Sequence, residues 1–177
     1  PRLGLWMGLP LPGRLALVLE KVGDLPYGEN PHQRAAFYRE TTHRSGSLAD
    51  ATQLHGAPPT FNNLMDLDAA YRIAADYTAP TVVITKHTDP VGLASAEELV
   101  DAYRRALDTD PVSSFGGIVG VNRELDGVTA REIAANSYEA VIAPGFSQAA
   151  IGILRAKPGL ELLAVPASPA DGMRDYG

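Results

Sequence analysis

The sequence contains no cysteine, and this absence excludes disulfide bonds and every thiolate metal site. A zinc-dependent deaminase site, which needs a His/Cys/Cys or three-Cys ligand set, is excluded for the same reason. The four histidines lie far apart and form no H-x-x-x-H pair, so the sequence gives no support for a metal site. A chain without cysteine is typical of the cytosol, and we expect a cytoplasmic protein.

Long apolar runs and basic stripes are also lacking. No apolar run reaches the roughly 18 residues of a membrane span, so we expect no membrane association. The apolar start, Pro1–Leu11, has no lysine-rich lead and no small-residue cleavage site, which argues against a signal peptide. It also has no initiator Met, which indicates a start inside a longer polypeptide. With a net charge of −6 and no basic stripe, no nucleic-acid partner is expected. An anionic small molecule stays compatible, because local amides and cations decide its binding.

What is present is a globular balance, with 45% hydrophobic and 20% charged residues over 177 positions. Apolar or β-branched runs alternate with amphipathic stretches. The pattern predicts strands at 15–22, 35–39, 81–85, 117–121, 140–143 and 160–165, and helices at 63–77, 95–107, 129–135 and 147–156. The composition of 15–22 also suits a helix. Strand–helix alternation predicts an α/β layered domain with a largely parallel central sheet.

Side chains near three of the predicted helix starts are suited to capping. Asn62 or Asn63 is a natural N-cap for the helix at 63–77, because its side chain can accept from a free backbone N–H. Two Ser/Thr-x-x-Glu capping boxes are predicted further along, formed by Ser95 with Glu98 and by Thr129 with Glu132.

Two loops carry candidate polar side chains for chemistry. The first, residues 27–33, contains Tyr27, His32 and Gln33 in a Gly/Asn/Pro turn, and its alternative reading is an ordinary turn with a surface His. The second, residues 86–92, begins with Lys86 and His87 directly after the TVVIT strand. Neighbouring side chains on a strand alternate between its faces, but a turn at Lys86 can bring both to one pocket. His suits proton transfer and Lys an oxyanion or phosphate, while the alternative is a capped loop with a solvated Lys.

Two weaker candidates follow. Ser113–Gly117 combines two hydroxyls with two glycines, which allows close backbone approach to an anion, although a Ser/Gly turn before a strand is commonly only a turn. Glu139 begins the EAVIAPG run, where a carboxylate is usually solvated. Because ligands of α/β folds sit at strand ends, we expect Lys86 and the Ser113–Gly117 loop on one edge of the sheet.

Six segments follow one another in a recognisable order: LPYGENPHQRAAFY (25–38), QLHG (53–56), FNNLMD (61–66), KHTDPVG (86–92), TDPVSSFGG (109–117) and EAVIAPGF (139–146). Their order resembles the transformylase domain of the bifunctional AICAR transformylase/IMP cyclohydrolase family. The match runs from about residue 15 to 165, and several motifs in order are far more specific than any one alone.

The resemblance implies a three-layer α/β/α fold, one half of a cytidine-deaminase-like pair, without zinc. It implies a linker remnant over 1–14, a first unit over 15–165, and a loop over 166–177 leading to a second unit that the chain lacks. The implied reaction moves a formyl group from 10-formyltetrahydrofolate, the co-substrate, to the 5-amino group of AICAR in purine biosynthesis. A separate domain of the family closes the product to IMP. For the full-length family a homodimer is expected.

The resemblance also implies residue roles. His87 matches the family's proton-transfer histidine and Lys86 its lysine partner. AICAR-holding positions match Tyr27, Gly116 and Glu139, and nearby pocket positions match Asn63 and His32.

Three positions depart from the family pattern. Pro26 stands where the family has a nucleotide-binding Arg, and Pro offers neither charge nor donor. Asp89 replaces an Asn, and Val91 replaces a Cys, which is a mild change. These departures leave open a second reading, in which the chain is a non-catalytic module that binds a nucleotide weakly or pairs with another chain.

Overall fold

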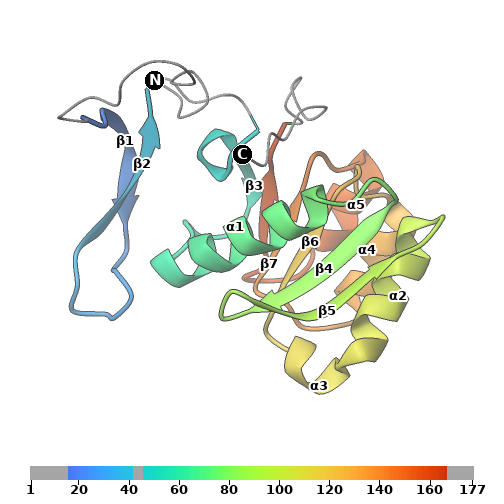
Figure 1. Cartoon of the computed structure of the whole chain (residues 1–177). Helices are drawn as coiled ribbons and strands as arrows, with labels where there is room; N and C mark the ends of the chain where they lie inside the picture. The colour runs from blue at the N-terminus through green and yellow to red at the C-terminus, as the bar shows by residue number, and fades with distance from the viewer. Residues whose placement is uncertain (1–15, 42–45, 167–177) are drawn as a thin grey trace, which may run out of the picture.

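The computed structural model describes residues 16–41 and 46–166, and its centre is one six-stranded sheet (Figure 1). The strand order is β3–β8–β7–β6–β4–β5. The strands are β3 (Thr52–His55), β4 (Thr81–Lys86), β5 (Asp89–Ser95), β6 (Ile118–Val121), β7 (Ala140–Ala143) and β8 (Glu161–Ala164). The predicted linker over 1–14 lies outside the described residues, as does the predicted tail after Pro166.

The sheet is mixed, so the prediction of a largely parallel sheet is wrong. Only the β6–β7 and β7–β8 pairs are parallel, whereas β3–β8, β4–β6 and β4–β5 are antiparallel. The reason is two strands, β3 and β5, that the sequence pattern did not reveal. Strand β3 runs against β8 at one edge of the sheet. Strand β5 returns directly alongside β4 as a hairpin, and the chain then crosses over to place β6 on the other side of β4. Both neighbours of β4 therefore run against it.

Helices cover both faces of the sheet and give the three α/β/α layers. One face carries α1 (Phe61–Ala75), and the other carries α2 (Leu99–Thr109), α4 (Gly127–Ala134) and α5 (Gln148–Leu154). Alternation along β7 shows the division, because Val141 packs into the core under α2, α4 and α5 while Ile142 packs against α1. No helix in the described ranges is long and apolar enough to cross a membrane.

All three predicted helix caps are wrong. Thr60, rather than Asn62 or Asn63, caps α1 by accepting from the Asn63 N–H. Ser95 lies in β5 and its hydroxyl is 2.7 Å from that of Thr81, so it forms no capping box. Ser147 is the N-cap of α5, where the predicted helix begins.

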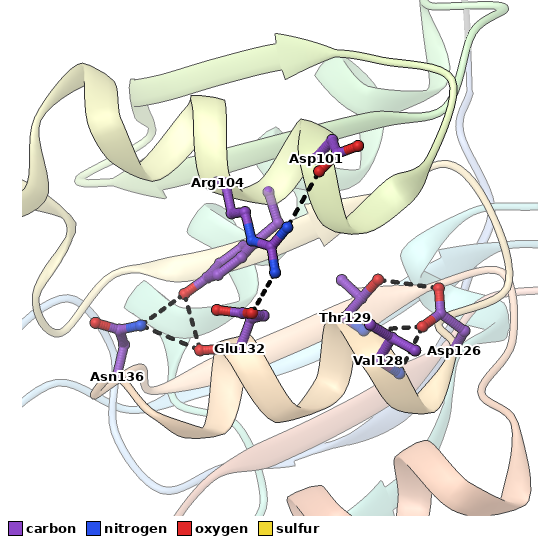
Figure 2. A network of polar contacts seen from close by, with 8 residues as sticks. Asp101, Arg104, Asp126, Val128, Thr129, Glu132 and Asn136 are labelled. Atoms are coloured by element: carbon purple, nitrogen blue, oxygen red, sulfur yellow. Dashed lines mark hydrogen bonds and ion pairs between the residues drawn. The ribbon is translucent and has the colours of Figure 1, made fainter.

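The second predicted capping box, at α4, is also wrong, because Asp126 caps this helix by accepting from the N–H groups of Val128 and Thr129. Glu132 instead accepts from the Arg104 guanidinium at 2.6 Å and ties α4 to α2 (Figure 2). Asn136 donates to the buried Tyr103 hydroxyl at 3.0 Å in the same network. Burial is the main cause of the raised pKa of Tyr103. This network fixes the helical layer behind the sheet.

A two-stranded ribbon stands beside the main sheet (Figure 1). It pairs β1 (Leu19–Leu25) with β2 (Ala35–Glu40) in antiparallel register. The strand at 35–39 is confirmed, while the strand predicted at 15–22 begins later, and Leu15 lies outside the described residues. Leu25 and Phe37 pack against the core on the α1 side, so the ribbon and its connecting loop are held next to that helix.

Candidate functional site

One edge of the main sheet gathers most of the candidate side chains. The register pairs Thr85 with Ile118, Ile118 with Ala140, and Ala140 with Glu161. The end of β4 therefore lies beside the starts of β6, β7 and β8. The prediction that Lys86 and the Ser113–Gly117 loop share an edge is confirmed, although through antiparallel pairing rather than through parallel strand ends.

The Lys86–His87 segment is a tight hairpin rather than an open loop. Lys86 pairs with Asp89 across the β4–β5 ladder, which leaves His87 and Thr88 as the two turn residues. Both have left-handed backbones, with φ of 55° and 64°, as a two-residue hairpin of the I′ type requires. The Lys86 ammonium donates to the Phe115 carbonyl oxygen at 2.8 Å, and His87 is exposed.

Asp66, on the second turn of α1, holds this hairpin. Its two carboxylate oxygens accept from the backbone N–H groups of His87, at 3.1 Å, and of Thr88, at 2.5 Å. The Thr85 hydroxyl donates to the backbone oxygen of Asp66 at 3.2 Å. Sequence reasoning assigned Asp66 no role. The only available signal was its place at the end of the FNNLMD segment.

Asn63, on the first turn of α1, is oriented by two hydrogen bonds. Its amide nitrogen donates to a Glu161 carboxylate oxygen at 3.1 Å, and its amide oxygen accepts from the Thr60 hydroxyl at 3.0 Å. Glu161 was not a candidate, because its run Leu-Glu-Leu-Leu is typical of a buried strand and carries no motif.

Glu161 is a buried acid with an incomplete set of partners. The residue is 6% exposed, and among the described residues its second carboxylate oxygen has no hydrogen-bond partner. Burial raises the pKa of Glu161 to about 7, with the Asn63 hydrogen bond lowering it and the Glu139 carboxylate raising it. The exposed Glu139 lies next to it, since the Glu161 N–H donates to the Glu139 carbonyl oxygen at 2.9 Å.

The Ser113–Gly117 loop does not offer free hydroxyls to an anion. It contains the end of the short helix α3 (Pro111–Ser114), and both serine hydroxyls donate to Asp110, at 2.6 Å and 2.7 Å. The Gly116 N–H donates to the Ser137 carbonyl oxygen at 2.9 Å. What the loop contributes is shape, because Gly116 has a φ of 71° and open space where a side chain would stand.

The loop with Tyr27 and His32 joins the β1–β2 ribbon and reaches the first turn of α1. The Asn62 amide donates to the Glu29 carbonyl oxygen at 3.4 Å, and the loop closes on itself through Gly28 N–H to the Gln33 carbonyl oxygen at 2.9 Å. Tyr27 is half-buried and His32 is exposed. No described hydrogen bond joins either side chain to Lys86, His87 or Glu139.

This edge therefore combines the Lys86 ammonium, the His87 imidazole, the Asn63 amide and three carboxylates, of Asp66, Glu139 and Glu161. No group of three or more His, Asp or Glu side chains is arranged for a metal within the described ranges. An imidazole beside an ammonium is suited to removing a proton from a nucleophile while a developing oxyanion is stabilised. The carboxylates and the amide supply acceptors and donors for a polar ligand.

Comparisons with known proteins agree on one family. The family model described as AICARFT/IMPCHase bienzyme matches residues 6–176. A Ruminiclostridium cellulolyticum protein named bifunctional purine biosynthesis protein PurH is 46% identical over 155 residues, 88% of this chain and 30% of the relative. Proteins of the same name from Acetivibrio thermocellus and Bacillus cereus are 47% identical over 152 residues and 45% identical over 159 residues. They are covered over 30% and 31% of their lengths, so the chain spans less than a third of these relatives.

Proposed function

Because the chain belongs to the AICARFT/IMPCHase bienzyme family, we propose that it supplies the AICAR-binding side of a transformylase site in purine biosynthesis. In this reaction, 10-formyltetrahydrofolate donates a formyl group to the 5-amino group of AICAR. The proposal covers one part of that site, since the chain corresponds to about 30% of each relative's length.

The observation that carries the proposal is the shared edge of the sheet. Lys86, His87, Gly116 and Glu139 lie along this edge although they come from three separated segments, and Asn63 of α1 contacts Glu161 at the same edge. His87 takes the proton of the AICAR amine during attack, because an aromatic amine is a poor nucleophile. Lys86 stabilises the oxyanion of the tetrahedral intermediate. When this intermediate collapses, the bond from the formyl carbon to the folate nitrogen breaks, and that nitrogen takes up the proton and leaves as tetrahydrofolate.

The remaining candidate residues bind AICAR. Tyr27 and His32 reach it from the ribbon loop, which the Asn62–Glu29 hydrogen bond holds next to α1. Residues 15–165 form the first cytidine-deaminase-like unit. The second unit, which brings most of the folate contacts, belongs to the part of the relatives that this chain does not match. The complete protein is a cytoplasmic homodimer that also carries the cyclohydrolase activity.

A second function, a nucleotide-binding module without catalysis, is favoured by Pro26. This residue is exposed next to Tyr27 and stands where the family has an Arg that binds the nucleotide. The substitution removes a phosphate-binding cation without disturbing the Lys86–His87 hairpin. Weak binding without turnover is the outcome that this second function predicts.

Two measurements test these functions. Calorimetric titration of the chain with AICAR should show binding that Glu139→Gln weakens and Glu97→Gln, beyond the opposite end of β4, leaves unchanged. For catalysis, the chain should replace the matching 155-residue segment of the Ruminiclostridium cellulolyticum relative. The proposed catalytic function is supported if this chimera transfers the formyl group and His87→Ala lowers its kcat by about 10²–10⁴-fold. Binding without turnover supports the module, and equal binding by both Glu variants contradicts the proposed site.

A further inference from the structure

The turn that carries His87 has a backbone that its side chains disfavour. Left-handed φ values suit Gly and Asn, and a β-branched residue such as Thr88 rarely adopts them. Sequences that favour this turn place Asn-Gly or Asp-Gly at its two positions, whereas this chain has His-Thr. Contacts outside the turn must therefore hold it in place.

Asp66 provides such contacts from the neighbouring helix. Each of its carboxylate oxygens accepts from one turn amide, so both N–H groups of the strained residues point at one negative charge. The Thr85 hydroxyl donates to the Asp66 carbonyl oxygen and fixes the helix against the last residues of β4. Within the turn itself, the Thr88 hydroxyl donates to the His87 carbonyl oxygen at 2.7 Å.

Two other roles for this carboxylate do not fit its contacts. It is not the counter-ion of Lys86, because the Lys86 ammonium donates to the Phe115 carbonyl oxygen instead. It is not a cap of its own helix, because Thr60 holds that position. Asp66 forms no ion pair in the described part of the chain.

We propose that Asp66 is a positioning residue, whose carboxylate holds the His87–Thr88 turn in its left-handed conformation and thereby directs the Lys86 and His87 side chains toward the ligand. The inference rests on the proposed function for the roles of Lys86 and His87, but not for the conformation of the turn. Asn63, one turn earlier on the same helix, is fixed by Glu161, so α1 sets both sides of the site.

The conformational part is tested on the chain itself by amide hydrogen exchange. Asp66→Ala should speed exchange at the His87 and Thr88 amides by about 10-fold or more, as expected for losing hydrogen bonds to a charged group. Asp66→Asn keeps one acceptor oxygen and should give a smaller change. Asp68→Asn, two residues along α1, is the matched control and should leave both amides unchanged. Unchanged exchange in Asp66→Ala overturns the proposal.

The functional part is tested by rescue in the chimera. Asp66→Ala should lower kcat by about 10–100-fold with a smaller change in the KM for AICAR, since a misdirected base mainly affects the chemical step. Thr88→Gly, added to Asp66→Ala, should recover most of that loss, because Gly adopts a left-handed backbone without strain.

A failure of Thr88→Gly to rescue a soluble, folded Asp66→Ala chimera overturns the positioning role. An inactive parental chimera instead contradicts the proposed enzyme, and the exchange measurement then decides on Asp66 alone. The two failures are therefore distinguishable.

Discussion

The Lys86 ammonium lies 2.8 Å from the carbonyl oxygen of Phe115, and this contact joins the end of β4 to the loop before β6. It exists because β4 and β6 are antiparallel, which sets the last residue of one against the first residues of the other. An ammonium has three donors, so Lys86 can keep this contact and still donate to a ligand oxygen. The hydrogen bond therefore orients the ammonium and leaves two of its donors for a ligand.

The first prediction concerns this lysine. In the chimera, Lys86→Met should lower kcat by about 10²–10³-fold, the usual loss when a group that stabilises an oxyanion is removed. Its free energy of unfolding should fall by no more than about 1.5 kcal/mol, because Lys86 is only half-buried and loses one hydrogen bond, to the Phe115 carbonyl oxygen. Steady-state kinetics and urea denaturation check both values, with Lys21→Met in the ribbon as the control. A large loss of stability would mean that Lys86 is a structural residue.

The second prediction concerns the contact that seats α1 on the sheet. A Cβ at Gly120 in β6 would lie 2.7 Å from the backbone oxygen of Ala70 in α1. Gly120→Ala should therefore push the helix outward and lower the free energy of unfolding by about 1–3 kcal/mol. Gly152 in α5 has nothing within 4 Å, so Gly152→Ala should be neutral or stabilise by up to about 1 kcal/mol. Equal midpoints of the two variants in urea would contradict the close packing.

Most buried elements were predictable because they carry a local signal. The β-branched run at Thr81–Thr85 and the apolar face from Leu64 to Ala74 follow the periods of a strand and a helix, and both elements are present. Strand β5 was missed because DPVGLAS contains Pro and Gly, which usually mark loops. Glycine is required at position 92 of this strand, because the Ala106 backbone of α2 approaches too closely for any side chain.

Helix caps were harder, because several side chains near each start can accept the same hydrogen bond. At α4, both Asp126 and Thr129 are suitable, and the backbone chooses Asp126 by beginning the helix at Gly127. At α2, Glu98 is the N-cap but makes no side-chain cap hydrogen bond. Local spacing alone does not distinguish these cases.

These two caps give the third prediction. Asp126→Ala should lower the free energy of unfolding by about 1–2 kcal/mol, because it leaves the Val128 and Thr129 N–H groups without their acceptor. Glu98 is the N-cap residue of α2. Glu98→Ala should change the free energy of unfolding by less than about 0.5 kcal/mol, since no cap hydrogen bond is lost. Thermal or urea unfolding of the pair measures the difference. If Glu98→Ala is the more damaging change, the assignment of the caps is wrong.

Motifs made part of the candidate site predictable, since Lys86 and His87 follow a recognisable strand. Asp66 lies in the FNNLMD segment, but its role depends on contacts with the distant His87–Thr88 turn. Glu161 lies in no motif and enters the site through its contact with Asn63. Glu161 reaches Asn63 only because β8 lies between β3 and β7. Such contacts depend on strand order, and the order was not deducible without β3 and β5, which the sequence pattern did not reveal.

The fourth prediction is a pH dependence of stability that comes from Glu161. Its pKa is about 7 in the folded chain against an ordinary value of 4.5, so the folded state holds this proton more tightly than the unfolded state. The contribution to stability is therefore full below about pH 4.5 and is lost as the pH rises through about 7, by up to about 3 kcal/mol.

Glu161→Gln removes this titration and keeps the shape of the side chain. Relative to the parent, the variant should gain stability between pH 5 and about 8, because the parent must bury a charge as the pH rises. Urea denaturation across this range measures the difference, and Glu124→Gln, an exposed acid, is the control. A constant difference between parent and Glu161→Gln at all pH values would refute the assignment.

The last prediction concerns Pro26, the main departure from the family pattern. Pro26 is exposed beside Tyr27, in the loop that the Asn62–Glu29 hydrogen bond holds at α1. Pro26→Arg should restore a phosphate-binding cation and tighten AICAR binding by about 10-fold, the value of one charged hydrogen bond. Any change in kcat should be smaller, because the phosphate contact is made in the ground and transition states alike.

Calorimetry with AICAR and with its nucleoside, which lacks the phosphate, separates charge from shape. Pro26→Gln controls for the loss of the ring. If the nucleoside gains as much affinity as AICAR, the arginine does not act on the phosphate, and Pro26 does not mark the phosphate end of the site.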